Sequence, residues 1–530
     1  MRDFENGGRS LAVARHGMAA TSHPASTLAA LDILREGGNA LDAAVAACAV
    51  QCVVEPGSTG IGGDCFVLMA PKGGTQVLAY NGSGRAPAAA TPAWFAENGI
   101  SSLQRQTPHV VTVPGAVEAW ERLLSAHGTM ALDKVLRPAI LHARDGYAVA
   151  PRALRDWIAQ RDLLARNPAA AAVFLPGGEP PRIGDVHRQP ELADTLEAIA
   201  EGGARAFYEG RIAEDMVASL RTLGGLHTLE DFAAARGEFV EPIRTTFRGH
   251  EVWECPPNGQ GVIALLILNI LSRFPGRGDP LSVDRLHVEV EATRLAYGIR
   301  NAFLADPAQA EVPVEWLLSD ELADDLAARI DTSRVIKPLP ALSPGAHRDT
   351  VYISVVDKDR NAVSFINSIF HNFGAGIMSR KTGVLFHARG ESFVLDPNHP
   401  NAIGPGKRPL HTIIPGMVTK GDRAIMPFGV MGGHYQAMGH AHFLSKVFDY
   451  GLDVQSAIDL PRLFPLPGTD RVEMEKRLRD TIGPEFERRG FGVAEPVSAI
   501  GGGQAIMIDW EKGTLQGGSD PRKDGCALGY

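Results

Sequence analysis

The sequence predicts a fold that mixes α-helices with antiparallel β-strands, and three observations support it. Helical patterns occupy Pro24–Glu36, Ala40–Val54 and much of Ala153–Leu229. Cys65–Met69 is a short apolar run after a glycine-rich turn, which is typical of a buried strand. From Thr350, two runs of β-branched and aromatic residues flank a polar five-residue turn, and this pattern is a strong hairpin signal.

Glycine and capping residues set the limits of these elements in turn. Gly37-Gly38 ends the first helix, and Asn39 caps the second. Within Ala153–Leu229, the stretch LPGGEPPRIGD interrupts the helices and indicates a surface loop. Leu281–Asn301 has helical spacing and predicts a long amphipathic helix.

Composition bounds the kind of protein. The chain has 530 residues, of which 45% are hydrophobic and 21% charged, so it can bury one or more large cores. At about 150 residues per domain, this length suggests roughly three domains. The net charge of −9, with no long block of like charge, argues against a nucleic-acid partner.

The sequence shows no pattern that predicts a targeting or membrane segment. Residues 1–21 lack the apolar core of a signal peptide, and the alanine-rich run 40–54 is too short to span a bilayer. We therefore expect a cytoplasmic protein that is soluble and has no membrane partner.

Five scattered cysteines give no disulfide or metal pattern. Cys48 and Cys52 lie one helical turn apart, which by itself is compatible with a metal site. No second Cys or His pair completes such a site, so we expect apolar buried cysteines, and neither a metal nor an organic cofactor.

The chain changes character just before Thr350. Residues 338–348 contain three prolines and no apolar periodicity, which predicts an exposed loop. Thr350 therefore stands where a loop meets the first strand of the hairpin.

Motifs along the chain occur in an order that resembles one known family. Those of the last third are TVYISVVDKDRNAVSFINSIFHNFGAGI from Thr350, GPGKRPLHTIIP from Gly404, FGVMGG from Phe428 and GGSDPR from Gly517. Earlier ones include SHPASTLAALDILREGGNALDAAVAA, GSTGIGGDCF, VPGAVEAW and EATRLAYGIRNAFLADP. Together they resemble the γ-glutamyltransferase family of N-terminal nucleophile hydrolases. The resemblance covers nearly the whole chain and implies an α+β fold, the four-layer αββα sandwich.

The resemblance implies that Thr350 is a self-generated N-terminal nucleophile. A threonine hydroxyl is a poor nucleophile until a base removes its proton. Cleavage of the Asp349–Thr350 bond would free an α-amine, whose pKa of about 7.7–8.0 suits that role. Residues 1–349 would form a large subunit and 350–530 a small one. The two fragments would stay associated as one αββα domain.

Acyl transfer also requires groups around the nucleophile. Gly432 and Gly433 match the family's glycine pair, whose backbone N–H groups stabilise the oxyanion. Ser368 matches a hydroxyl residue that hydrogen-bonds to the nucleophile. The alternatives without a catalytic role are that Thr350 only begins a strand, that Gly432 and Gly433 form a turn, and that Ser368 is a half-buried strand residue.

Several positions depart from the family at the place where it binds the α-carboxylate and α-ammonium of a γ-glutamyl group. Phe370, Arg389 and Ser392 replace an asparagine, a glutamine and an aspartate, so ammonium acceptors are lost and a cation is gained. The other departures are His411 and Thr412, which replace paired serines, and Ser83, which replaces an arginine and has Arg85 two residues on.

These changes favour a small anionic substrate. Arg85, Arg389 and one of His411 or His434 would form an anion pocket, which Phe370 would narrow. We therefore hypothesise an amidohydrolase acting on the amide of a compact acid without an α-ammonium. The departures resemble the oxamate amidohydrolase subgroup of the family. Glu391, beside Ser392, can accept an ammonium and keeps γ-glutamyl activity open.

The alternatives fall into distinct classes. One is a genuine γ-glutamyltransferase or glutathione hydrolase, and another is an acylase of β-lactam side chains, which needs a roomier apolar pocket. A third is an uncleaved pseudoenzyme that acts as a binding protein. The expected partner is a small-molecule amide, and a homodimer of processed heterodimers is compatible with the sequence.

Overall fold

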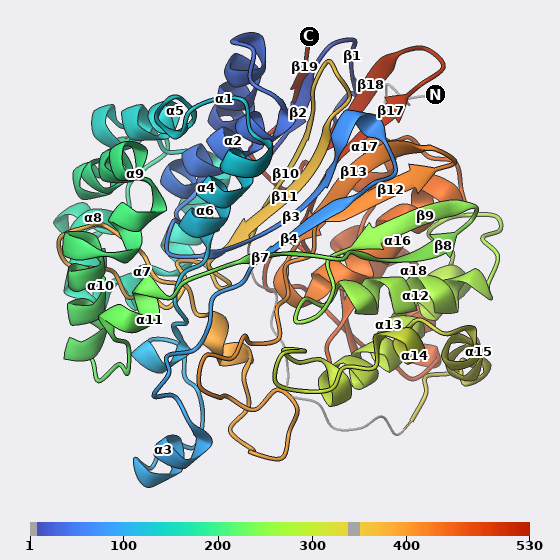
Figure 1. Cartoon of the computed structure of the whole chain (residues 1–530). Helices are drawn as coiled ribbons and strands as arrows, with labels where there is room; N and C mark the ends of the chain where they lie inside the picture. Colours follow the sequence, from blue (N-terminus) through green and yellow to red (C-terminus); the bar gives the residue numbers. More distant parts are fainter. Residues whose placement is uncertain (1–7, 338–349) are drawn as a thin grey trace.

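The computed structural model describes residues 8–337 and 350–530, and its main strands form two seven-stranded antiparallel sheets that stack face to face (Figure 1). Sheet A has the order β1 (Ala12–Ala14), β18 (Thr514–Ser519), β17 (Gly502–Asp509), β13 (Arg423–Met431), β12 (Gly416–Lys420), β9 (His250–Glu254) and β8 (Ile243–Phe247). Sheet B has the order β19 (Ala527–Gly529), β2 (Met18–Ala20), β10 (Val351–Val356), β11 (Ala362–Ser368), β3 (Asp64–Ala70), β4 (Leu78–Gly82) and β7 (Glu238–Val240).

Helices cover the outer face of each sheet (Figure 1). Those on the side of sheet B include α1 (Pro24–Arg35), α2 (Ala40–Val54), α4 (Ala116–His127), α5 (Leu132–Asp145), α9 (Pro190–Tyr208) and α10 (Gly210–Thr222). Those on the side of sheet A include α12 (Gly261–Ser272), α13 (Val283–Phe303), α15 (Asp320–Ala328), α16 (Gln436–Phe448), α17 (Val454–Asp459) and α18 (Lys476–Arg488).

Smaller elements complete the described chain. The short helices are α3 (Pro92–Glu97), α6 (Pro151–Ala159), α7 (Arg161–Ala165), α8 (Pro168–Phe174), α11 (Leu229–Ala233) and α14 (Val314–Leu317). The remaining strands are β5 (Tyr147–Ala148) and β6 (Val186–His187), which pair with each other, and β14 (Leu463–Pro465), β15 (Arg471–Met474) and β16 (Gly492–Ala494), which form a three-stranded sheet.

Three apolar layers hold the sandwich together. Between the sheets lies a buried cluster that contains Phe66, Tyr352, Met417 and Ile506. Two further cores join each sheet to its own helices. Because helices cover one face of sheet B and sheet A covers the other, β10 and β11 are buried at every position. The four-layer αββα sandwich implied by the resemblance is confirmed.

The local predictions agree closely with these elements. Helices α1 and α2 match Pro24–Glu36 and Ala40–Val54, and Asn39 forms a capping box with Asp42. The hairpin from Thr350 is the pair β10–β11, and the stretch LPGGEPPRIGD is largely exposed. The predicted loop at residues 338–348 and the residue Asp349 lie outside the described residues.

The prediction of an amphipathic helix at Leu281–Asn301 is wrong in one respect. Helix α13 forms there, but every residue from Arg285 to Tyr297 is buried. Its charged residues pair inside the protein instead of facing water, as when Glu289 binds both Arg285 and Lys446. A charged side chain with a partner can be buried, and a hydropathy pattern does not show the partner.

Both predicted subunits contribute strands to both sheets. In sheet B, β2 of the first segment pairs with β10 and β19 of the second, and β11 pairs with β3. Sheet A alternates in the same way, because β1 pairs with β18, and β12 with β9. Separating 1–349 from 350–530 would therefore open both sheets. The point of division at Thr350 stays a prediction.

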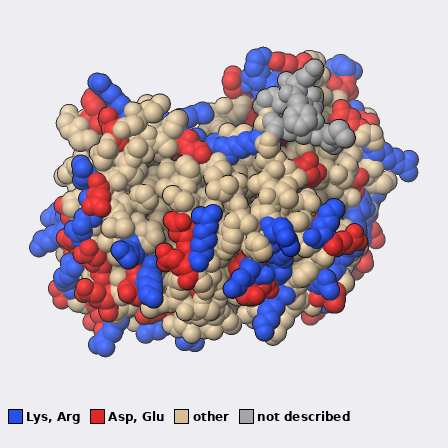
Figure 2. Space-filling model, turned by 90° about the horizontal axis from the view of Figure 1, so that it is seen from above, with Lys and Arg blue, Asp and Glu red and all other residues tan. Residues whose placement is uncertain are grey.

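Figure 2 shows basic and acidic side chains interspersed over one face, with no field of a single sign. Among the described residues, no helix is long and apolar enough to cross a membrane. All five cysteines are free; Cys526 is half-buried and the other four are buried.

The contact between the two sheets yields a first prediction. A Cβ on Gly429 of β13 would lie 2.3 Å from the ring of Tyr352 in β10, so Gly429→Ala should overpack the interface and lower stability by about 1–3 kcal/mol. Gly298, in α13, has nothing within 4 Å of such an atom, so Gly298→Ala should be neutral or stabilising by up to about 1 kcal/mol. Thermal unfolding compares the two variants, and equal midpoints would contradict this account.

Candidate active site

Thr350 and Ser368 face each other at one end of the central hairpin. Val351 of β10 pairs with Asn367 of β11, so Thr350 lies opposite Ser368, and their hydroxyl oxygens are 3.2 Å apart. Both residues are buried. The side-chain amide of Gln436, the first residue of α16, lies 3.5 Å from Thr350 Oγ1.

The hydrogen bonds of Ser368 determine the direction of the bond to Thr350. Its oxygen accepts from the backbone N–H of Phe370 at 2.9 Å and from Arg389 Nη2 at 3.1 Å. A serine hydroxyl has two acceptor lone pairs and one hydrogen. With both lone pairs in use, the hydrogen is directed to Thr350 Oγ1, which leaves the Thr350 proton for a base.

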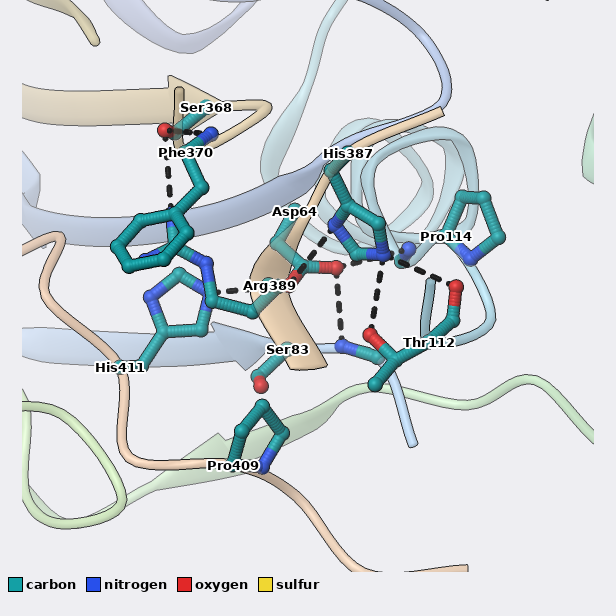
Figure 3. Close-up of polar contacts among 12 residues, drawn as sticks. Asp64, Ser83, Thr112, Pro114, Ser368, Phe370, His387, Arg389, Pro409 and His411 are labelled. Atoms are coloured by element: carbon teal, nitrogen blue, oxygen red, sulfur yellow. Dashed lines mark hydrogen bonds and ion pairs between the residues drawn. The ribbon is translucent and has the colours of Figure 1, made fainter. Parts of the chain in front are cut away.

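Arg389 is a fully buried cation in this cluster (Figure 3). Its Nη1 donates to Thr412 Oγ1 at 2.8 Å, and its guanidinium carbon lies 4.1 Å from the centre of the Phe370 ring. Phe370 has a φ of 79°, a conformation that is unusual for a large residue. This strained backbone places the Phe370 N–H on Ser368 and the Phe370 ring against the guanidinium.

Asp64 supplies the nearby negative charge. It begins β3 in register with Ser368, and its Oδ1 accepts from the N–H groups of Gly84 and Gly115 at 3.0 and 3.2 Å. Its Oδ2 lies 2.9 Å from His411 Nε2. Burial alone would raise the pKa of Asp64, but the neighbouring His387, the His411 hydrogen bond and Arg389 outweigh it and lower the pKa to about 2.

The two histidines beside Asp64 are neutral near pH 7. Burial, followed by the charge of Arg389, lowers the pKa of His411 to about 3. Burial also lowers the pKa of His387, whose Nε2 lies 2.9 Å from the carbonyl oxygen of Thr112 (Figure 3). His411 therefore donates to Asp64 as a neutral ring and adds no positive charge to the predicted anion pocket.

The glycine pair follows directly after β13. Gly432 and Gly433 have φ values of 121° and 57°, which few other residues adopt. The carbonyl of Gly432 accepts from the N–H of Tyr435 at 3.0 Å. His434 accepts from Arg300 on its Nδ1 at 3.0 Å, and its ring centre lies 6.4 Å from that of Phe370.

Arg85 is the predicted site residue that the described contacts do not join to this cluster. Its guanidinium donates to the carbonyl of Gly406 at 3.0 Å and lies 3.7 Å from Asp306. With Ser83 it lines a hollow that Gly84 and Gly115 also line. Glu391, the alternative ammonium acceptor, is 2.6 Å from His371 Nε2, and the Ser392 carbonyl accepts from Asn401.

Sequence reasoning missed Asp64, His387 and Gln436. Asp64 carried a usable signal, because an acid at the end of a glycine-rich turn begins an otherwise apolar strand. His387 and Gln436 carried none, because their neighbours in the sequence do not indicate what they contact. No group of three or more His, Cys, Asp or Glu side chains within residues 8–337 and 350–530 could hold a metal ion.

Comparisons with known proteins agree over the whole chain. The family model of gamma-glutamyltranspeptidase matches residues 26–530. The glutathione hydrolase-like YwrD proenzyme of Bacillus subtilis is 38% identical over 522 residues, covering 97% of this chain and 98% of its own. The oxamate amidohydrolase proenzyme of Klebsiella pneumoniae is 34% identical over 533 residues, which cover 98% of this chain and 99% of that proenzyme. The crystal structure of cephalosporin acylase from Bacillus halodurans matches with a TM-score of 0.93 and 40% identity. The match covers 100% of this chain and 98% of the acylase chain.

The αββα sandwich, together with relatives that are proenzymes, defines a self-processing hydrolase of the N-terminal nucleophile type. The chain belongs to the gamma-glutamyltranspeptidase family, and it is an enzyme of that family.

The charge of Asp64 leads to a prediction about pH. Its pKa in the folded protein, about 2, is below the ordinary aspartate value of 3.8. An acid with a lowered folded pKa stabilises the protein above the unfolded pKa, and this contribution is lost as the pH falls through the folded pKa. The stability advantage of wild type over Asp64→Asn should therefore shrink by about 2 kcal/mol between pH 5 and pH 2. Denaturant unfolding at several pH values measures it, and parallel curves would exclude a lowered pKa for Asp64 in the folded protein.

Proposed function

We propose that the chain cuts itself before Thr350 and then hydrolyses the amide of a compact carboxylic acid, of the oxamate kind, through an acyl-Thr350 intermediate. The observation that carries the proposal is the buried guanidinium of Arg389, which bonds to Ser368, the neighbour of Thr350. A fixed cation two hydrogen bonds from the nucleophile suits a substrate whose carboxylate is close to its amide carbon.

Apart from substrate and water, the proposed chemistry uses groups of this chain only. The α-amine of Thr350 takes the hydroxyl proton while Oγ1 attacks the amide carbon, and the carbonyl electrons move to oxygen. Gly432 and Gly433 stabilise that oxyanion through their N–H groups, and Ser368 donates to Oγ1. The C–N bond then breaks, and ammonia leaves with the proton from the α-ammonium. Water attacks the ester with the amine again as base, which releases the acid and restores Thr350.

The electrostatics of the site favour an anion over an amino-acid head. Arg389 is fully buried, and a substrate ammonium beside it would be repelled with little screening. The Phe370 ring lies against the guanidinium where a polar acceptor would be required. Glu391 is engaged by His371. The oxamate amidohydrolase proenzyme at 34% identity supports the same substrate class.

Hydrolysis of γ-glutamyl compounds is the second candidate function. The glutathione hydrolase-like proenzyme is 38% identical to this chain, and Glu391 stands between Arg389 and Ser392 in the same short helical turn. A substrate ammonium that displaced His371 would find this carboxylate. The cytoplasmic location and the dimer of processed heterodimers stay predictions.

Self-cleavage is tested by removing the hydroxyl. Thr350→Ala should remain one full-length chain on intact-mass analysis under denaturing conditions and hydrolyse no amide. Thr350→Ser keeps a hydroxyl, so it should still cleave, though more slowly because serine is less restricted about χ1. A wild-type preparation that never splits would favour the pseudoenzyme, and a Thr350→Ala chain cut at the same bond would refute the assignment.

Substrate class is tested by ammonia release from oxamate against cleavage of γ-glutamyl-4-nitroanilide. Arg389→Gln removes a charged hydrogen bond and should lower kcat/KM for oxamate by about 10- to 100-fold. Arg389→Lys keeps the charge without the planar fork, so its kcat/KM for oxamate should lie between those of wild type and Arg389→Gln. Activity of wild type on the γ-glutamyl amide alone, unchanged or improved in Arg389→Gln, would establish the second candidate instead.

A further inference from the structure

We infer that Gln260, held by Arg300, is a positioning residue that keeps the glycine pair and the Arg389 anchor in register with Thr350. The inference rests on the proposed function for the roles of Gly432, Gly433 and Arg389. Gln260 lies outside the nucleophile hairpin, in the predicted large subunit.

The side chain of Gln260 joins two separate segments of the site. Its Nε2 donates to the carbonyl of Thr412 at 2.8 Å and to the carbonyl of Gly433 at 3.0 Å. Its own backbone N–H donates to the carbonyl of His411 at 2.9 Å. Gln260 is fully buried, so water does not compete for these bonds.

Arg300 decides which way the Gln260 amide points. Its Nη1 donates to Gln260 Oε1 at 2.9 Å, which places the amide nitrogen on the side of the two carbonyls. A flipped amide would set its oxygen against two carbonyl oxygens and its nitrogen against a guanidinium. Arg300 also donates to His434 Nδ1, and Tyr297 bonds to the carbonyl of His434, so helix α13 holds the same loop twice.

The glycine pair has a physical need for such a clamp. Glycines have the widest choice of backbone conformation, and two in succession hold an N–H direction poorly on their own. An oxyanion site is effective only when its donors are preorganised, and a displacement of about 1 Å can cost about 100-fold in rate. The bond from Gln260 to the Gly433 carbonyl fixes the end of the pair that β13 does not hold.

The second carbonyl links the clamp to the anion site. Thr412 holds Arg389 through its hydroxyl at 2.8 Å, and Gln260 holds the backbone of the same Thr412. One amide group therefore ties the oxyanion donors to the residue that orients the guanidinium. Loss of this amide should move both the oxyanion donors and the guanidinium away from Thr350. The turnover step should then slow by more than ground-state binding weakens.

The test uses the processed protein and two matched variants. Gln260→Met keeps the length of the side chain and removes its hydrogen bonds. Gln455→Met does the same to another buried glutamine, which bonds to the Ser519 carbonyl and to Asp459, neither of which contacts the site residues described above. Both should split normally by intact mass, and both should lose thermal stability to a similar extent. Only Gln260→Met should lower kcat, by about 10- to 100-fold, with KM changed less than about threefold.

Gln260→Glu adds a conservative test. It preserves the bond to Arg300 but presents oxygen to the two carbonyls, so it should be no more active than Gln260→Met. Activity is measured with whichever of oxamate and γ-glutamyl-4-nitroanilide wild type hydrolyses. Wild-type or near-wild-type kcat in both Gln260 variants would overturn the inference.

Hydrogen exchange separates this inference from the proposed function. Gln260→Met should speed amide exchange in peptides covering 408–415 and 429–436, and Gln455→Met should leave them as in wild type. This readout needs no substrate, so it decides the clamp even if wild type hydrolyses neither amide. Unchanged exchange in both peptides would overturn it.

Discussion

The antiparallel register between β10 and β11 is the constraint on which the site depends. It brings Thr350 opposite Ser368, and the next pairing, β11 with β3, brings Asp64 opposite the same serine. A slip of one residue would turn each of these side chains to the other face of the sheet. The register is strongly specified because both faces of the hairpin are buried, one under α2 and the other against sheet A.

Charge is buried beside this hairpin in a balanced form. Arg389 and Asp64 are both fully buried, and each makes hydrogen bonds, the cation to two hydroxyls and the carboxylate to backbone N–H groups and His411. Removing one charge of such a set leaves the other uncompensated in the interior. This destabilises the folded protein much more than replacing both charges by apolar groups. The hydroxyls of Ser368 and Thr412 hold the guanidinium, so the cation stays next to the nucleophile.

Much of this arrangement was predictable from local patterns. The two β-branched runs around a polar turn indicated β10 and β11, and Asn39 indicated the start of α2. The charge on α13 was misleading, since Glu289 and Arg285 found partners inside the protein. Asp64 and Gln260 were not identified, because their partners are brought to them by the stacking of segments distant in sequence: His411 is 347 residues from Asp64, and Gly433 is 173 from Gln260.

The sequence by itself determined the fold, the family and the position of Thr350 at the start of a core strand. These follow from periodicity, turn chemistry and motif order, which act over a few residues at a time. Only the tertiary structure decided which cation stands near that threonine. It selected Arg389 over Arg85 and made His411 neutral, because burial and charged neighbours set a pKa and a pairing, and both are properties of the packed chain.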